Sequence, residues 1–214
     1  MYAFERIEGA PIIHKSTGTA NRSRSPALGL CFALLFLAMF ATATSCGNAA
    51  PGPENAHAAS STAFRLQSAA FQEGTSIPAR FSCEGEDVSP PLAWTGAPSA
   101  ARSFALIVED PDAPAGVWTH WVAYDLPAQT RALQENTPKQ GELPGGGLQG
   151  RNSFGRIGYG GPCPPAGNAH RYFFRLYALD TTLGLRAGAD KQQVLAAMKG
   201  HIVGRTELMG RFQR

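Results

Sequence analysis

Short apolar runs, separated by turns rich in glycine and proline, make up the chain from residue 64 onward. Phe104 to Val108 is an unbroken apolar run, which predicts a strand covered on both faces, and Tyr172 to Leu179 predicts a second strong strand. Shorter or weaker runs predict further strands at Phe64–Phe71, Ile77–Ser82, Leu92–Trp94, Trp118–Asp125 and His201–Phe212, the last with breaks at its glycines. The hydrophobic pattern therefore indicates a protein built from many short strands.

One of these runs contains a histidine inside a hydrophobic pattern. Because side chains alternate across a strand, a period of two groups four residues on one face: Trp118, His120, Val122 and Tyr124. Trp121 belongs to the opposite face. His120 is therefore expected to point into a largely apolar face. A lone histidine there is more often a hydrogen-bonded core residue than a functional one.

A single helix is expected late in the chain. Asp190 and Gln193 have the spacing of a capping box, Val194 and Met198 give the helix an apolar side, and Gly200 ends it. Residues 126–148 hold several turn signals and predict a long irregular connection. No alternation of strands and helices suggests a parallel sheet. The fold class predicted is all-β, an antiparallel Greek-key β-sandwich with one or two short helices near the C-terminus.

The first 46 residues have the parts of a secretory signal. Basic residues precede the apolar run Ala27–Ala43, and small residues then lead to Cys46. A retained membrane anchor is the alternative, because this run approaches the length of a spanning helix. Ala43 to Gly47 resembles a bacterial lipoprotein processing site, which makes Cys46 the expected lipidated residue. The predicted organisation is a leader at 1–46, a flexible tether at 47–63 and a folded domain at 64–214, exported and held in the cell envelope.

Charge adds little to this picture. The 214 residues carry a formal charge of +3, with 16% charged residues. From Cys46 onward, 15 Lys and Arg face 14 Asp and Glu, which leaves +1. The basic excess thus belongs mostly to the leader, and nothing in the composition indicates binding to nucleic acid.

Two loops carry the candidate chemistry. Asp110 and Asp112 lie between prolines at the exit of a buried strand, and His170 begins another strand. Alone, each aspartate is expected to cap turn amides, and each histidine to be a core residue. Together with His120, they form a set in which a carboxylate fixes an imidazole so that it can present a donor to an anion. We therefore expect the two loops to meet in one anion-binding pocket.

The glycine-rich stretch 150–168 supplies backbone amides, including those of Gly160 and Gly161, that suit phosphate or carboxylate. Hydrolysis is an alternative, with Ser153 or a water activated by a histidine, although the sequence has no Gly-x-Ser-x-Gly elbow. A metal site is a further alternative, but no His-x-x-x-His or Cys-x-x-Cys spacing is present. No cofactor is expected.

Several motifs together resemble the phosphatidylethanolamine-binding protein family, in its bacterial Raf-kinase-inhibitor-like (YbhB/YbcL-type) branch. They cover nearly the whole chain from Phe64 to Phe212: Asp110-Pro-Asp-Ala-Pro114, Thr119-His-Trp-Val122, Gly158-Tyr-Gly-Gly-Pro-Cys-Pro-Pro165, His170-Arg-Tyr172 and Asp87-Val-Ser-Pro-Pro-Leu-Ala-Trp94. The resemblance implies a β-sandwich with a small pocket for phosphate-like anions, including phospholipid head groups.

The resemblance also implies which residues form the pocket. Asp110, His120 and His170 would line it, and three further residues would lie beside it: Asp112, Pro162 and Tyr172. Asp87 or Trp94 would be nearby. Arg171 is expected to pair with a carboxylate rather than to bind the ligand.

Cysteine usage suggests one cross-link. Cys31 lies in the leader and Cys46 is the expected lipidation site, so Cys83 and Cys163 remain, each in a Gly/Pro-rich loop. In an exported protein these two are candidates for a disulfide, and two buried thiols are the alternative.

The leading functional hypothesis is a non-enzymatic protein that binds a phosphate-like anion or a phospholipid head group. The alternative of another class is an inhibitor or regulator of a secreted enzyme, such as a serine protease, acting through an exposed loop at Gly141–Gly147. Family resemblance makes a homodimer plausible, and it identifies no protein target.

Overall fold

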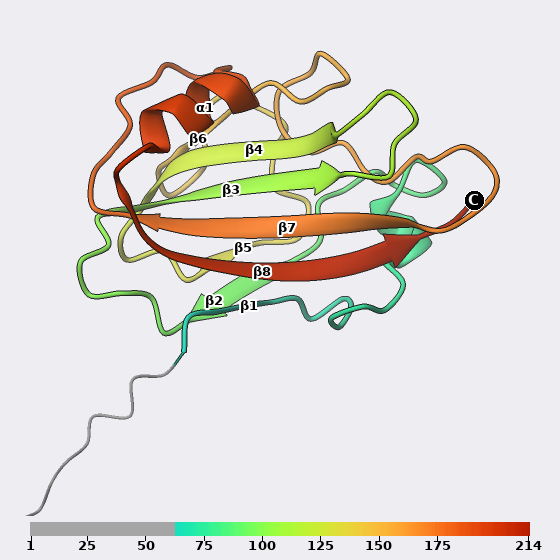
Figure 1. Ribbon diagram of the computed structural model, residues 1–214, viewed down its shortest axis with the longest axis horizontal. Helices are drawn as coiled ribbons and strands as arrows, with labels where there is room; N and C mark the ends of the chain where they lie inside the picture. The colour runs from blue at the N-terminus through green and yellow to red at the C-terminus, as the bar shows by residue number, and fades with distance from the viewer. Residues whose placement is uncertain (1–62) are drawn as a thin grey trace, which may run out of the picture. The chain divides into compact units, whose positions relative to one another are not determined.

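The computed structural model describes residues 63–214, which form two antiparallel sheets packed face to face (Figure 1). The smaller sheet has the order β1 (Arg65–Gln67), β2 (Leu92–Thr95) and β5 (Ala132–Leu133). The larger has the order β6 (Leu148–Gln149), β4 (Trp118–Pro127), β3 (Ser103–Asp110), β7 (His170–Leu179) and β8 (Ile202–Phe212). The antiparallel β-sandwich expected from the sequence is confirmed. The leader, Cys46 and the tether lie outside the described residues, apart from Ala63.

The main core lies between the two sheets. Trp94 of β2 packs against Phe104 of β3 with ring centroids 5.5 Å apart, and both side chains are fully buried. A second cluster covers the outer face of the larger sheet, where Val194 and Met198 pack with Ile107 of β3. All eight residues of β3 are consequently buried. This explains why its sequence is a continuous apolar run rather than an alternating one.

The expected helix is α1, Lys191–Met198. Its capping box is formed as predicted: Gln193 donates its backbone N–H to the Asp190 carboxylate over 2.9 Å, and the Asp190 N–H donates to the Gln193 side chain. No helix within residues 63–214 combines the length and hydrophobicity needed to cross a bilayer.

Two predicted strands differ from the structure. The run Ile77–Ser82 is not a strand, because Pro78 opens a short 3₁₀ helix at Ala79–Phe81. β8 runs without a break through its glycines. At Gly210 a Cβ would lie 2.5 Å from Ile77 Cγ1, so the glycine permits close packing of the neighbouring segment rather than ending the strand.

A β-bulge changes which way His120 points. Val108 pairs with Trp121, yet the next residue of β3, Glu109, pairs with Thr119, so β4 contains one extra residue at this point. Side chains at a bulge no longer alternate between the faces. His120 lies with its ring 5.1 Å from that of Tyr172, in the cluster between the sheets. The predicted common face with Val122 and Tyr124 is therefore wrong, since those two pack under α1.

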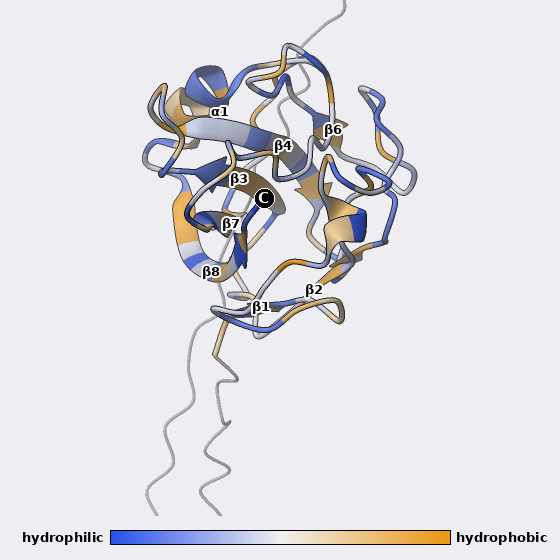
Figure 2. Cartoon of the chain, turned by 90° about the vertical axis from the view of Figure 1, so that its right-hand side faces the viewer, coloured by the Kyte–Doolittle hydropathy of each residue, from blue (hydrophilic) through white to orange (hydrophobic). Residues whose placement is uncertain are grey.

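One end of the sandwich gathers the predicted functional residues. β3 ends at Asp110, β4 begins at Trp118, and β7 begins at His170. This end lies on the right of Figure 1 and faces the viewer in Figure 2, where the loops that lead into and out of these strands surround it.

Candidate functional site

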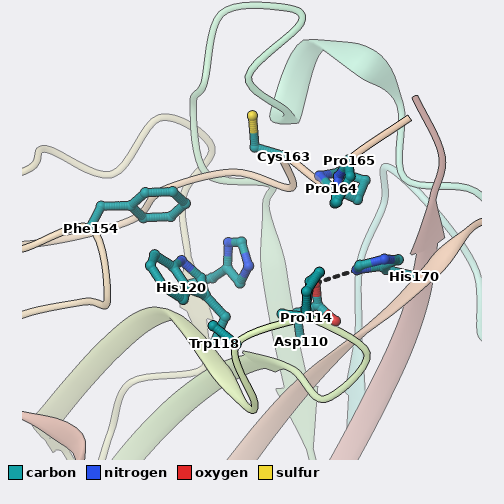
Figure 3. A pocket seen from close by; sticks show the side chains of 11 residues that line it. Asp110, Pro114, Trp118, His120, Phe154, Cys163, Pro164, Pro165 and His170 are labelled. Atoms are coloured by element: carbon teal, nitrogen blue, oxygen red, sulfur yellow. Dashed lines mark hydrogen bonds and ion pairs between the residues drawn. The ribbon is translucent and has the colours of Figure 1, made fainter. Parts of the chain in front are cut away.

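A cavity of about 310 Å³ opens at this end of the sandwich (Figure 3). Its three titratable lining residues are the ones expected from the two loops: Asp110, His120 and His170. The remaining lining is apolar or aromatic, apart from one cysteine: Ala113, Pro114, Ala115, Trp118, Phe154, Cys163, Pro164 and Pro165. The site is therefore a small hydrophobic hollow with a few polar groups, which is the usual composition of a small-molecule pocket.

Asp110 orients His170. Its Oδ2 lies 2.8 Å from His170 Nδ1, and its Oδ1 accepts the backbone N–H of Asp112 over 2.8 Å. The carboxylate is 3% exposed, so its lone pairs depend on these donors. Because Nδ1 donates to the carboxylate, Nε2 of His170 is the ring nitrogen left for a ligand.

His120 is held in the same way by a backbone carbonyl. Its Nδ1 lies 2.7 Å from the Gly160 carbonyl oxygen, and the residue is only 2% exposed. Burial lowers the pKa of His120 below its usual 6.5, while the Gly160 carbonyl and the charge of Asp110 oppose this shift. These surroundings thus favour a neutral imidazole that carries its proton on Nδ1 and presents Nε2 as a hydrogen-bond acceptor.

Aromatic rings support His120 on two sides. Phe154 and Tyr172 both meet the imidazole edge-to-face, at centroid distances of 5.5 and 5.1 Å, and Phe154 also contacts Trp118. Tyr172 itself does not line the cavity. Its hydroxyl is buried, and burial together with the nearby Asp110 carboxylate raises its pKa.

Asp112 fixes the loop at the rim. Its carboxylate binds Arg171 in a fork, with Nε and Nη2 at 2.9 and 2.7 Å, and also accepts the Arg171 backbone N–H. These contacts hold the pKa of Asp112 at about 2. Arg171 therefore pairs with a carboxylate, as expected. Asp112 joins the two loops without lining the cavity between them.

The glycine amides do not have the predicted role. Gly160 donates its N–H to the His120 carbonyl over 2.9 Å, and Gly161 donates to Asp87 Oδ1 over 2.6 Å. Both N–H groups are thus hydrogen-bonded within the fold, one to β4 and the other to the loop that contains Asp87, and they are not available to a ligand. Pro162 also makes a contact within the fold, because its carbonyl accepts the Cys83 N–H. Trp94 lies in the main core, away from the cavity.

Cys83 and Cys163 form a disulfide with their Cα atoms 5.4 Å apart. Cys163 also lines the cavity, so the cross-link ties its wall to the segment around the 3₁₀ helix.

Positive charge is scarce at the cavity: among residues 63–214, no lysine or arginine lines it. Ser153 lies elsewhere, lining a different hollow and accepting the Thr119 backbone N–H. Within the same range, no three His, Cys, Asp or Glu side chains converge as metal ligands. His120 and His170 are therefore the lining residues that can bind an anion in this cavity.

The family model for phosphatidylethanolamine-binding proteins matches residues 67–213, and thus every element that builds the cavity. The chain belongs to this family. The resemblance inferred from the motifs is confirmed, including its YbcL-like branch.

Individual relatives support the same family assignment. A UPF0098 protein of Methanothermobacter thermautotrophicus is 54% identical over 151 residues, covering 71% of this chain and 99% of the relative. The crystal structure of a phosphatidylethanolamine-binding protein homologue from Chlamydia trachomatis is 43% identical, with a TM-score of 0.66, over 71% of this chain and 98% of its own. The crystal structure of Escherichia coli YbcL, a member of the mammalian phosphatidylethanolamine-binding protein family, is 32% identical, with a TM-score of 0.67 and the same coverage.

Several wall residues of this family member were not predicted. Trp118 and Phe154 contribute aromatic rings, and Pro114, Pro164 and Pro165 contribute rigid apolar surface. The prolines lie inside motifs that the sequence displays, but a motif does not say which of its residues face the cavity. Phe154 has no signal of its own, because it lies in a loop far from both histidines in sequence.

Proposed function

We propose that the protein is an exported binding protein that holds a phosphate-type anion, such as the head group of a phospholipid, between His120 and His170. The observation that carries this proposal is that each histidine has its Nδ1 engaged by a fixed acceptor, at 2.7 and 2.8 Å, in a cavity otherwise lined by apolar groups. Both imidazoles are thereby oriented before any ligand arrives, which reduces the entropy lost on binding.

The size of the cavity limits the ligand. About 310 Å³ is at the lower end of small-molecule pockets and suits a head group rather than an acyl chain. In the complex the two Nε2 atoms would be the hydrogen-bonding groups that face the anion. We expect binding without turnover, and a phosphatase assay with and without a chelator tests this directly.

Replacing His170 by Ala tests the proposed site. We expect a loss of phosphoethanolamine affinity of at least about tenfold, because one charge-assisted hydrogen bond disappears. The matched control is His201→Ala. His201 also pairs with an aspartate, Asp180 at 2.9 Å, but it is exposed and lies at the other end of β8. Equal affinities of the two variants in calorimetry would count against the site.

Export and lipid anchoring complete the proposal. They are supported by the features of residues 1–46 and by the disulfide, which is typical of proteins outside the cytoplasm. Mass spectrometry of the native protein should find a mature chain that begins at a lipidated Cys46. A native chain that retains residues 1–45, or that begins elsewhere, would refute this part.

A further inference from the structure

A second hollow adjoins the histidine cavity. It measures about 270 Å³ and shares two residues with the first, Phe154 and Cys163. Figure 3 shows both of them on the side of the cavity away from the Asp110–His170 pair. The two hollows therefore adjoin at these two residues, and a ligand held at the histidines would have to reach the second hollow beside them.

Arg156 supplies the positive charge that the first cavity lacks. It lines the second hollow, and its guanidinium lies 5.3 Å from the centroid of the Phe154 ring. Within residues 63–214 it forms no ion pair with a carboxylate. A cation that stacks on an aromatic ring and has no carboxylate partner remains available to an incoming anionic group.

The loop backbone holds Arg156 at this place. Buried Asn152 accepts the N–H groups of Phe154 and Arg156 through one side-chain oxygen, at 3.0 and 3.1 Å, and donates to the Gly158 carbonyl. The loop is therefore built around Asn152, which presents the aromatic ring to one hollow and the guanidinium to the next.

The other charged residue in this hollow is already neutralised. Asp87 lines it, but one of its oxygens accepts the Gly161 N–H and the other lies 2.7 Å from Lys139 Nζ. The unbalanced charge of the second hollow is thus that of Arg156.

We propose that Arg156 determines specificity by binding a second anionic group of the ligand, so that the preferred ligand class is a phosphomonoester or phosphodiester that also carries a carboxylate or a further phosphate. This inference rests on the proposed function of the histidine cavity, because the first anionic group must lie there.

The test compares two probes that differ only in one carboxylate, O-phosphoserine and phosphoethanolamine, by calorimetry on the purified protein. We expect the protein to bind phosphoserine about fivefold more tightly, as for one partly exposed charge pair. Arg156→Gln should abolish that preference and leave phosphoethanolamine affinity within about twofold. Arg65→Gln is the control: it removes the same charge from an exposed position on β1 and should keep the preference.

Each outcome has a distinct meaning. If the wild-type protein shows no preference, or if the preference survives Arg156→Gln, the proposed role of Arg156 is overturned and the histidine site is not affected. Binding of neither probe overturns the histidine site, and this inference with it. The same pair presented as phosphatidylserine and phosphatidylethanolamine vesicles distinguishes a lipid head group from a free phosphate ester. A preference in either form that depends on Arg156 supports the inference.

Discussion

Anion binding to this cavity should take up a proton at His120. Burial lowers the pKa of His120 below 6.5, so above that pH the imidazole of the free protein is neutral and presents a lone pair at Nε2. A fully deprotonated anion such as sulfate has no hydrogen to offer that lone pair. It gains a hydrogen bond only if Nε2 is protonated, and its charge then raises the pKa of His120 in the complex.

The sign and size of the effect follow from linkage. Because the complex holds one more proton than the free protein, affinity falls as pH rises between the free and the bound pKa of His120. The slope is about tenfold per pH unit, equivalent to about 1.4 kcal/mol. We therefore expect the dissociation constant to rise with pH above 6.5, by up to about tenfold per pH unit, until the pH passes the pKa of His120 in the complex.

Sulfate is a suitable probe because it does not titrate in this range, whereas inorganic phosphate does. Calorimetry at several pH values, in two buffers of different ionisation enthalpy, measures both the slope and the number of protons taken up. His120→Asn should flatten the slope, since asparagine is polar and does not titrate. His170→Asn, measured in parallel, separates any contribution of the second imidazole. A sulfate affinity independent of pH, or a slope unchanged in His120→Asn, would refute the proposed protonation.

Three further predictions concern the framework of the site. The free protein should lose stability as pH falls below 6.5, because His120 has a lower pKa folded than unfolded and unfolding then takes up a proton; thermal melts should show this loss, smaller in sulfate and absent in His120→Asn. Asp112 acts in the same direction at lower pH: its folded pKa of about 2 lies below 3.8, so the stability it contributes is present above 3.8 and disappears as pH falls towards 2, and Asp112→Asn should remove that part of the acid transition. The disulfide closes a sequence separation of 80 residues, so reduction should lower the free energy of unfolding by about 4 kcal/mol; a count of two free thiols in the non-reduced mature protein, with Cys31 removed and Cys46 lipidated, would contradict the bridge.

Much of the fold could be predicted from local sequence. The unbroken run in β3 indicated burial on both faces, and the spacing of Asp190 and Gln193 located the start of α1. These signals work because they depend on residues close together in the chain. The run that begins at Ile77 does not form a strand for a local reason, since Pro78 lacks the N–H that a strand interior needs.

The site was predictable only in part. The motifs identified Asp110, His120 and His170, which line the cavity. The prediction that the amides of Gly160 and Gly161 bind the ligand is wrong, because both are hydrogen-bonded within the fold. A glycine-rich loop offers N–H groups in principle. Whether they remain free depends on distant partners, here the Asp87 carboxylate and the His120 carbonyl. Arg156 and Phe154 are likewise brought to the cavity by the fold around Asn152, for which the sequence contains no spacing rule.

The β-bulge of β4 shows why pairing, rather than composition, makes His120 functional. With regular alternation this histidine would share the face of Val122 and pack beneath α1, as a buried core residue. The extra residue opposite Glu109 instead places His120 and Trp121 together on the inner side, so that the imidazole reaches the cavity while the indole fills the core. A bulge is defined by its partner strand, and the alternation within β4 alone cannot reveal it. The apolar surroundings that are typical of a core histidine also lower the pKa of His120, and this low pKa is the reason why anion binding should be accompanied by uptake of a proton from solvent.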